Sequence, residues 1–131
     1  PNAPRRLPKA ITVAQVEALL NAVSGDDPVS VRDRAILELI YATGARITEI
    51  VSLDLDDLVD PTLLRVMGKG AKERIVPFGV PARRAVEAYQ ERGRPALATE
   101  ASGERGLETK TSGSFCTAPT RRRRSSRPAY R

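Results

Sequence analysis

One glycine most constrains how this 131-residue chain can fold. Gly44 lies within Tyr41–Ile50, which reads Tyr-Ala-Thr-Gly-Ala-Arg-Ile-Thr-Glu-Ile, and it follows an apolar helical pattern that ends at Thr43. Glycine adopts the left-handed conformation that terminates helices at little steric cost. We therefore predict that one helix ends at Gly44 and that a short new helix begins directly after it, with Arg46 at its start.

A second signature lies further along the chain. The segment Gly68–Arg74 reads Gly-Lys-Gly-Ala-Lys-Glu-Arg and separates two apolar, β-compatible runs, 63–67 and 73–78. Two such runs around a glycine-containing loop are typical of a β-hairpin, so Lys69 is expected at its tip. A lysine between glycines is equally common in an ordinary solvated turn, and spacing alone leaves that alternative open.

Apolar residues at helical spacing predict the other elements. Thr12 begins a first helix with a capping-box pattern, and a second helix runs from about Val31 to Thr43 with Tyr41 in the core. Pro81 begins a fourth helix as a first-turn proline. The expected order is α-α-α-β-β-α, with an extra small strand around Leu55 left open. The fold class is α+β, mainly helical, with a small antiparallel β-hairpin.

Composition divides the chain into three parts. Residues 1–11 are rich in proline and arginine and are expected to form an interdomain linker. Residues 12–99 carry the periodic apolar pattern of a folded unit, and residues 100–131 lose it. Residues 1–101 hold 14 Lys/Arg and 14 Asp/Glu, whereas 102–131 hold 8 and 2, so the end of the chain supplies the net charge of +6. We expect 100–131 to be a disordered basic tail, which could bind nucleic acid nonspecifically.

Several kinds of site are excluded by residue content. The chain has no histidine, which is the commonest metal ligand and general base, and its single cysteine, Cys116, cannot form an internal disulfide. No apolar run reaches the length needed to span a bilayer. We expect a cytoplasmic protein with no metal, no cofactor, no membrane association and no small-molecule substrate.

Arg46 and Lys69 suit phosphate chemistry. A guanidinium at a helix start can hold two phosphate oxygens, and Glu49, one turn on, could orient it through a buried pair. Lys69 on a hairpin tip could deliver a proton to a departing oxygen, while Lys72 and Arg74 would contact DNA phosphates and position the hairpin. An ordinary surface i,i+3 pair is the alternative for Arg46 and Glu49.

In their context the two segments resemble a known family. Leu39–Glu49 resembles the first-arginine box, and Arg65–Pro77 the β-hairpin lysine box, of Xer-type (XerD-like) tyrosine recombinases and their relatives in the phage-integrase family. Residues 4–9 look like the linker that precedes the catalytic domain of these enzymes. The resemblance covers residues 4–98 and implies the N-terminal half of a tyrosine recombinase catalytic domain.

The resemblance implies site-specific DNA recombination and integration, as in chromosome-dimer resolution during chromosome partition and cell division. In this family a tyrosine attacks the scissile phosphate and leaves a 3′-phosphotyrosine and a free 5′-hydroxyl, without a metal or nucleotide cofactor. Arg46 would neutralise the phosphorane, Lys69 would be the general acid for the 5′ oxygen, and Glu49 would orient Arg46. The partners would be double-stranded DNA and a recombinase tetramer that contains a related subunit.

The chain departs from the family pattern beyond residue 98. It has no second arginine box, no histidine and no tryptophan, and Tyr130 lacks the apolar helix that carries the family's nucleophile. We therefore expect a truncated recombinase that is inactive alone, and whether the chain is an enzyme stays open. A non-catalytic DNA-binding or regulatory module is the alternative, and a degenerate product without a role is a third.

The abrupt change of composition after Thr99 is also what an out-of-frame reading of a GC-rich gene would give. We hypothesise that the tail is frameshifted. A continuation with a His-x-x-Arg box in another reading frame of the gene would support this hypothesis, and the absence of such a continuation from every frame would exclude it.

Overall fold

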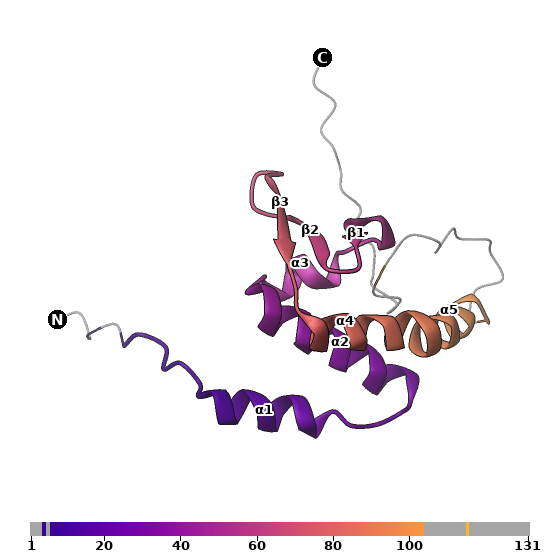
Figure 1. Ribbon diagram of the computed structural model, residues 1–131, viewed down its shortest axis with the longest axis horizontal. Coiled ribbons are helices and arrows are strands. Elements are labelled where there is room, and N and C mark those ends of the chain that lie inside the picture. Colours follow the sequence, from indigo (N-terminus) through magenta and orange to yellow (C-terminus); the bar gives the residue numbers. More distant parts are fainter. Residues whose placement is uncertain (1–3, 5, 104–114, 116–131) are drawn as a thin grey trace, which may run out of the picture.

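Helices of this chain pack against a small antiparallel sheet, which lies above α2 and α4 in Figure 1. The computed structural model describes residues 4, 6–103 and 115. This mixed architecture confirms the α+β prediction. The elements are α1 (Val13–Ala22), α2 (Pro28–Thr43), α3 (Ile47–Val51), the 3-10 helix η1 (Leu55–Asp57), β1 (Leu58–Asp60), β2 (Leu63–Met67), β3 (Glu73–Pro77), α4 (Val80–Ala88), the π-helix η2 (Tyr89–Gly93) and α5 (Arg94–Gly103).

The first helix begins as predicted but covers little of the core. Thr12 Oγ1 accepts from the Gln15 amide at 3.2 Å and the Thr12 amide donates to Gln15 Oε1 at 2.8 Å, which forms the expected capping box. Leu20 is the buried residue of α1, whereas Val13 and Leu19 are 63% and 49% exposed. The helix lies at the edge of the molecule in Figure 1 and contacts α2 near Leu20, whose carbonyl oxygen accepts from Arg34 Nη1, so most of its apolar stripe is uncovered among the described residues.

The second helix starts earlier than expected and ends where predicted. Asp27 caps it by accepting from the Ser30 amide at 3.0 Å, and Pro28 occupies its first turn. The helix ends at Gly44, whose φ of 64° and ψ of 15° are left-handed and whose amide donates to the Ile40 carbonyl at 2.9 Å. The glycine therefore has the conformation that the sequence required.

Tyr41 was expected in the core, and this prediction is wrong. Its side chain is 55% exposed, although Leu39, two residues earlier, is fully buried. Two residues on an α-helix turn about 200° around the axis, so Tyr41 faces nearly opposite to Leu39. The buried face of α2 instead comprises Val31, Ala35, Ile36, Glu38 and Leu39.

The predicted hairpin is present, and a third strand extends it. β2 pairs antiparallel with β3, with Leu64 opposite Val76 and Val66 opposite Arg74. The extra strand β1 pairs with the other edge of β2, and it begins three residues after Leu55, which lies in η1. Leu64 and Val66 are fully buried, so β2 attaches the hairpin to the core.

The last helices run as one rod from Val80 to Gly103, through the π-helical segment η2 (Figure 1). A Cβ on Gly93 would lie 2.7 Å from the Tyr89 ring and 3.2 Å from the Pro28 carbonyl oxygen, so the missing side chain lets the rod approach the start of α2. The predicted tail, 100–131, falls outside the described residues except for 100–103 in α5 and Phe115, which is buried.

One cluster of mainly aliphatic side chains forms the core and joins these elements. Through Ile50 and Val66 it also holds α3 and the hairpin, the two elements that carry the candidate site. Its members are Val31, Ala35, Ile36, Leu39, Ala45, Ile50, Leu53, Leu64, Val66, Phe78, Ala82, Val86, Tyr89, Leu97 and Phe115.

Candidate active site

The turn between α2 and α3 places Arg46. After Gly44 the chain buries Ala45, whose amide donates to Thr43 Oγ1 at 3.2 Å, and Arg46 then takes the N-cap position of α3 with extended backbone angles. Ala45 packs into the core on one side of the turn, so the neighbouring Arg46 side chain is directed outward. Its side chain is 74% exposed.

Glu49 is the buried charge of the site, with a side chain only 5% exposed. Arg74 binds it as a two-pronged fork: Nη1 donates to Oε1 at 3.1 Å and Nη2 donates to Oε2 at 3.0 Å. The Arg46 backbone amide also donates to Oε2 at 2.8 Å. The Arg74 hydrogen bonds, followed by this amide bond, lower the pKa of Glu49 from 4.5 to about 2, and the same pairing raises the pKa of Arg74.

The Arg46 guanidinium is held much more loosely than that of Arg74. Its contact with Glu49, from Nη1 to Oε1, is 3.5 Å long, at the limit of a hydrogen bond. Arg46 and Glu49 are therefore paired as expected, but the shorter hydrogen bond to Glu49 comes from the backbone amide of Arg46 and not from its guanidinium. The Arg46 guanidinium is left facing solvent, where an anion can reach it.

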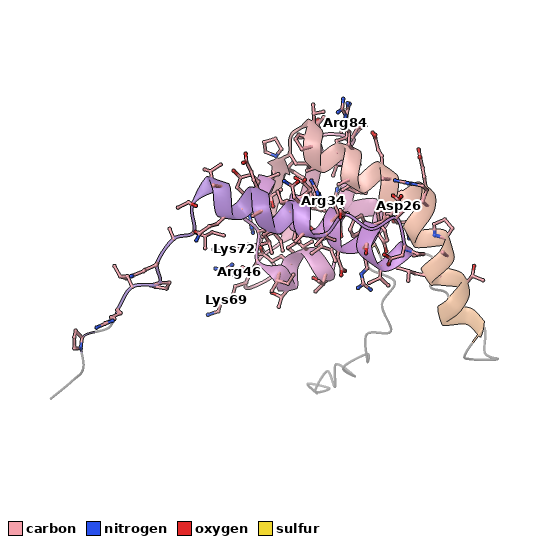
Figure 2. All side chains as sticks on the ribbon, turned by 90° about the horizontal axis from the view of Figure 1, so that it is seen from below. Asp26, Arg34, Arg46, Lys69, Lys72 and Arg84 are labelled. Atoms are coloured by element: carbon pink, nitrogen blue, oxygen red, sulfur yellow. The ribbon has the colours of Figure 1, made fainter. Side chains whose placement is uncertain are left out.

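The hairpin tip presents Lys69 to the same region. The Gly68 amide donates to the Lys72 carbonyl at 2.8 Å and closes the loop, and Gly70 and Ala71 both have positive φ, 76° and 58°. Lys69 and Lys72 are exposed at this tip. Figure 2 shows both lysines on the side of the molecule that also carries Arg46.

A hollow of about 460 Å³ joins the two predicted catalytic residues. Helix α3 and its two capping residues contribute Arg46, Glu49 and Ser52 to its wall, and the hairpin contributes Met67, Gly68 and Lys69. The fold thus brings Arg46, Glu49 and Lys69 to one open site. Lys72 lies outside this lining, on the exposed loop.

Arg74 is the residue whose position the sequence interpretation missed. Its guanidinium binds Glu49 with a side chain 43% exposed, a pairing that the sequence analysis did not include. The expected contact of Arg74 with DNA phosphate stays a prediction. Strand alternation carried the signal, because Arg74 lies on the same face of β3 as Val76, which packs on the core. That face of the strand meets the core at Val76, and Arg74 reaches α3 from it while remaining 43% exposed.

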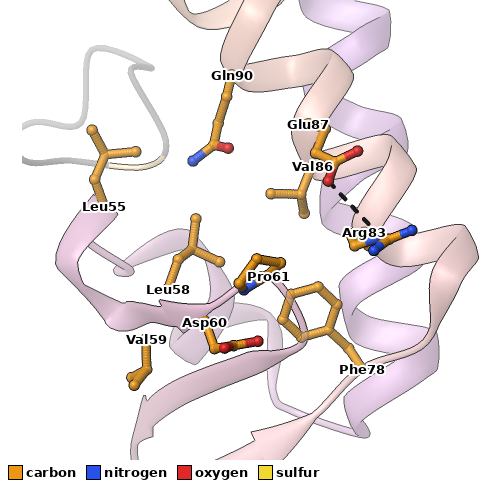
Figure 3. Close-up of a pocket in the computed structure, with 10 residues that line it drawn as sticks. All are labelled: Leu55, Leu58, Val59, Asp60, Pro61, Phe78, Arg83, Val86, Glu87 and Gln90. Atoms are coloured by element: carbon orange, nitrogen blue, oxygen red, sulfur yellow. Dashed lines mark ion pairs between the residues drawn. The ribbon is translucent and has the colours of Figure 1, made fainter.

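A second hollow, of about 320 Å³, lies between β1 and α4 (Figure 3). Its wall is about equally polar and apolar, and its apolar residues include Leu58, Phe78 and Val86. Arg83 and Glu87 face each other at its edge, with Nε and Oε1 3.8 Å apart. This hollow contains no second cation to hold a phosphate, so it lacks the chemistry of the Arg46–Lys69 site.

No cluster of three or more metal-ligating side chains occurs among the residues that the structure describes. None of their helices combines the length and the apolar character that crossing a membrane requires.

Comparison with known proteins assigns the family. The phage integrase family matches residues 9–129, a range that includes most of the predicted tail. The chain is 51% identical over 98 residues to tyrosine recombinase XerD of Halalkalibacterium halodurans, which covers 74% of this chain and 33% of that protein. It is 50% identical over 110 residues to tyrosine recombinase XerD of Mycobacterium tuberculosis (strain ATCC 25618 / H37Rv), covering 79% and 35%.

A solved structure agrees with these matches. The crystal structure of XerA recombinase superposes with a TM-score of 0.57 at 29% identity, over 70% of this chain and 32% of that chain. The chain therefore spans about a third of the length of the relatives that it matches. Sequence and fold together show that this chain belongs to the phage integrase family and is similar to the XerD tyrosine recombinases within it.

Proposed function

We propose that this chain supplies the phosphate-binding part of an active site for site-specific DNA recombination. Arg46 and Lys69 would act on the scissile phosphodiester of double-stranded DNA. One observation carries the proposal: both side chains line the same open hollow, and the Arg46 guanidinium, 74% exposed, is available to an anion.

The two residues have different roles in the proposed reaction. A tyrosine oxygen bonds to phosphorus while the bond to the 5′ oxygen breaks, which gives a 3′-phosphotyrosine and a free 5′-hydroxyl. Arg46 offsets the charge that grows on the non-bridging oxygens. The Lys69 ammonium donates a proton to the departing 5′ oxygen. As in the family it resembles, the proposed reaction uses no metal and no nucleotide cofactor.

Further parts of the proposal concern the whole protein. We propose chromosome-dimer resolution in the cytoplasm as its role, within a recombinase tetramer that includes a related subunit. Lys72 would contact DNA phosphate from the exposed side of the hairpin. Because the chain has no histidine and no second arginine box, we propose that it binds DNA but does not cleave it alone.

Binding to a fluorescently labelled DNA duplex, measured against salt, tests the phosphate site. Arg46→Met and Lys69→Met should each weaken binding roughly tenfold and lower the salt slope by about 0.9, the loss of one phosphate contact. Arg84→Met is the matched control, because Figure 2 shows Arg84 on α4, away from Arg46 and Lys69. Parental affinity in both site variants would exclude the proposal.

A nicked suicide duplex tests cleavage separately. We expect no covalent adduct that survives SDS, since the chain lacks the family's second arginine box and histidine. A non-catalytic DNA-binding or regulatory module is the second candidate, and the same missing residues favour it. An adduct that forms in the parent and disappears in Tyr130→Phe would overturn that second candidate and the expected inactivity together.

A further inference from the structure

Two arginines compete for one buried carboxylate in this site. Arg74 takes both oxygens of Glu49, at 3.1 and 3.0 Å, whereas the Arg46 guanidinium reaches only Oε1, at 3.5 Å. The exposed fractions follow this order, with 43% for the Arg74 side chain and 74% for Arg46. The geometry therefore shows that Arg74, and not Arg46, is the main ion-pair partner of Glu49.

This assignment decides what Arg46 can bind. A two-pronged guanidinium–carboxylate pair is a strong arrangement for both groups, and because the pair as a whole is neutral it attracts a second cation only weakly. A buried carboxylate without such a partner carries a large desolvation cost and draws in the nearest cation. Here that cation is Arg46, which already touches Oε1.

We infer that Arg74 is a positioning residue for Arg46: by occupying the Glu49 carboxylate, it keeps the Arg46 guanidinium free for a DNA phosphate. Without Arg74, the guanidinium of Arg46 folds onto Glu49 and is lost to the ligand. This inference rests on the proposed function of Arg46. It replaces the expectation that Arg74 itself contacts DNA.

Gly68 provides independent support, because its missing side chain makes room for the fork. A Cβ at this position would lie 3.3 Å from Arg74 Nη1 and 3.8 Å from Glu49 Oε1. It would also lie 3.3 Å from the Lys72 carbonyl oxygen, which accepts the hydrogen bond that closes the loop. Gly68, the residue before Lys69, thus leaves room for the Arg74 side chain to reach α3.

The test measures duplex affinity and its salt slope for variants of the full chain. Arg74→Met should weaken binding roughly tenfold and lower the salt slope by about 0.9, as Arg46→Met does, because both remove the same phosphate contact. The double variant R74M/E49Q should restore the parental affinity and slope, because it removes the carboxylate that captures Arg46. A direct phosphate contact by Arg74 predicts the opposite, a loss that the second change cannot repair.

A charge-matched control separates this effect from net charge. R74M/E73Q has the same net charge as R74M/E49Q but keeps Glu49, and Glu73 is an exposed neighbour on the same strand. Binding restored in R74M/E49Q and not in R74M/E73Q supports the inference. Restoration in both, or in neither, overturns it.

The outcomes also separate this inference from the proposed function. If Arg46→Met binds like the parent, the proposed phosphate site fails. If Arg46→Met weakens binding and Arg74→Met does not, only the inference fails. Thermal unfolding of each variant checks its fold. If R74M does not fold, the double variant R74M/E49Q decides. Parental duplex affinity in this variant supports the inference, and a loss of affinity as large as that of Arg46→Met contradicts it.

Discussion

Tyr89 and Phe115 meet edge to face in the core, with ring centroids 5.1 Å apart and ring planes at 69°. The Tyr89 hydroxyl donates to the Phe115 carbonyl oxygen at 2.8 Å, and the Phe115 amide donates to the Leu53 carbonyl oxygen at 2.8 Å. Both rings are fully buried. Phe115 therefore links the segment after α3 to the helical rod.

Phe115→Ala should lower the free energy of unfolding by roughly 3 kcal/mol, the usual cost of emptying an aromatic site in a core. Tyr89→Phe should lower it by only about 1 kcal/mol, because it removes the hydrogen bond from the hydroxyl to the Phe115 carbonyl and keeps the ring. Urea unfolding followed by circular dichroism measures both. Parental stability in Phe115→Ala would show that this residue does not belong to the core.

Glu49 should make the fold sensitive to acid. Its pKa in the fold, about 2, lies below the ordinary value of 4.5, so its contribution to stability is present above about pH 4.5 and disappears as the pH falls toward 2. Urea midpoints measured across this window should fall more steeply in the parent than in Glu49→Gln. Asp27, whose pKa is also lowered through its bonds to Ser30, adds a smaller loss that Asp27→Asn removes. Parallel profiles for the parent and Glu49→Gln would contradict the prediction.

Ala71 carries backbone strain at the hairpin tip. Among the described residues it is the one non-glycine with a positive φ, 58°. Ala71→Gly should raise the free energy of unfolding by about 1 kcal/mol, since glycine adopts this conformation without a Cβ clash. Lys72→Gly, at a neighbouring loop position without positive φ, is the control and should bring no gain. Chemical denaturation of the three proteins compares them, and equal stability would show that the tip relaxes freely.

The uncovered side of α1 should promote self-association. Val13 and Leu19 expose 63% and 49% of their surface, and Ile11, just before the helix, exposes 60%. Apolar side chains gathered on one exposed helix favour contact between copies. Light scattering should show mass increasing with concentration in the parent and less so in Val13→Ser/Leu19→Gln. Val59→Thr, an exposed apolar position on β1, should not reduce it; a concentration-independent parental monomer would contradict the prediction.

Local signals predicted the parts of the fold that depend on a few neighbouring residues. Gly44 and the loop between β2 and β3 were predictable because each conformation is set within one turn. The start of α2 was predicted at about Val31, three residues late, because the capping role of Asp27-Pro28 was not considered. The same two residues are a side-chain cap and a first-turn proline, which begin a helix.

Long-range contacts explain the remaining misses. Tyr41 and the stripe of α1 look apolar in sequence, but burial depends on which other elements cover them. The Arg74–Glu49 fork joins two segments 25 residues apart, so strand alternation indicates the face on which Arg74 lies but not the partner that it binds. The sequence thus identified Arg46 and Lys69 as a pair, whereas the binding of the Glu49 carboxylate by Arg74 became visible only in the folded chain.

The paired base of the hairpin makes the loop above it separable from the rest of the site. Met67 lies opposite Glu73 in the last rung of the sheet, and the Arg74 fork anchors the next residue to α3. An insertion or deletion between these anchors would change how far Lys69 extends without displacing Arg46. Loop length here is thus an independent variable, through which evolution or an engineer could adjust the reach of one cation while the other stays fixed.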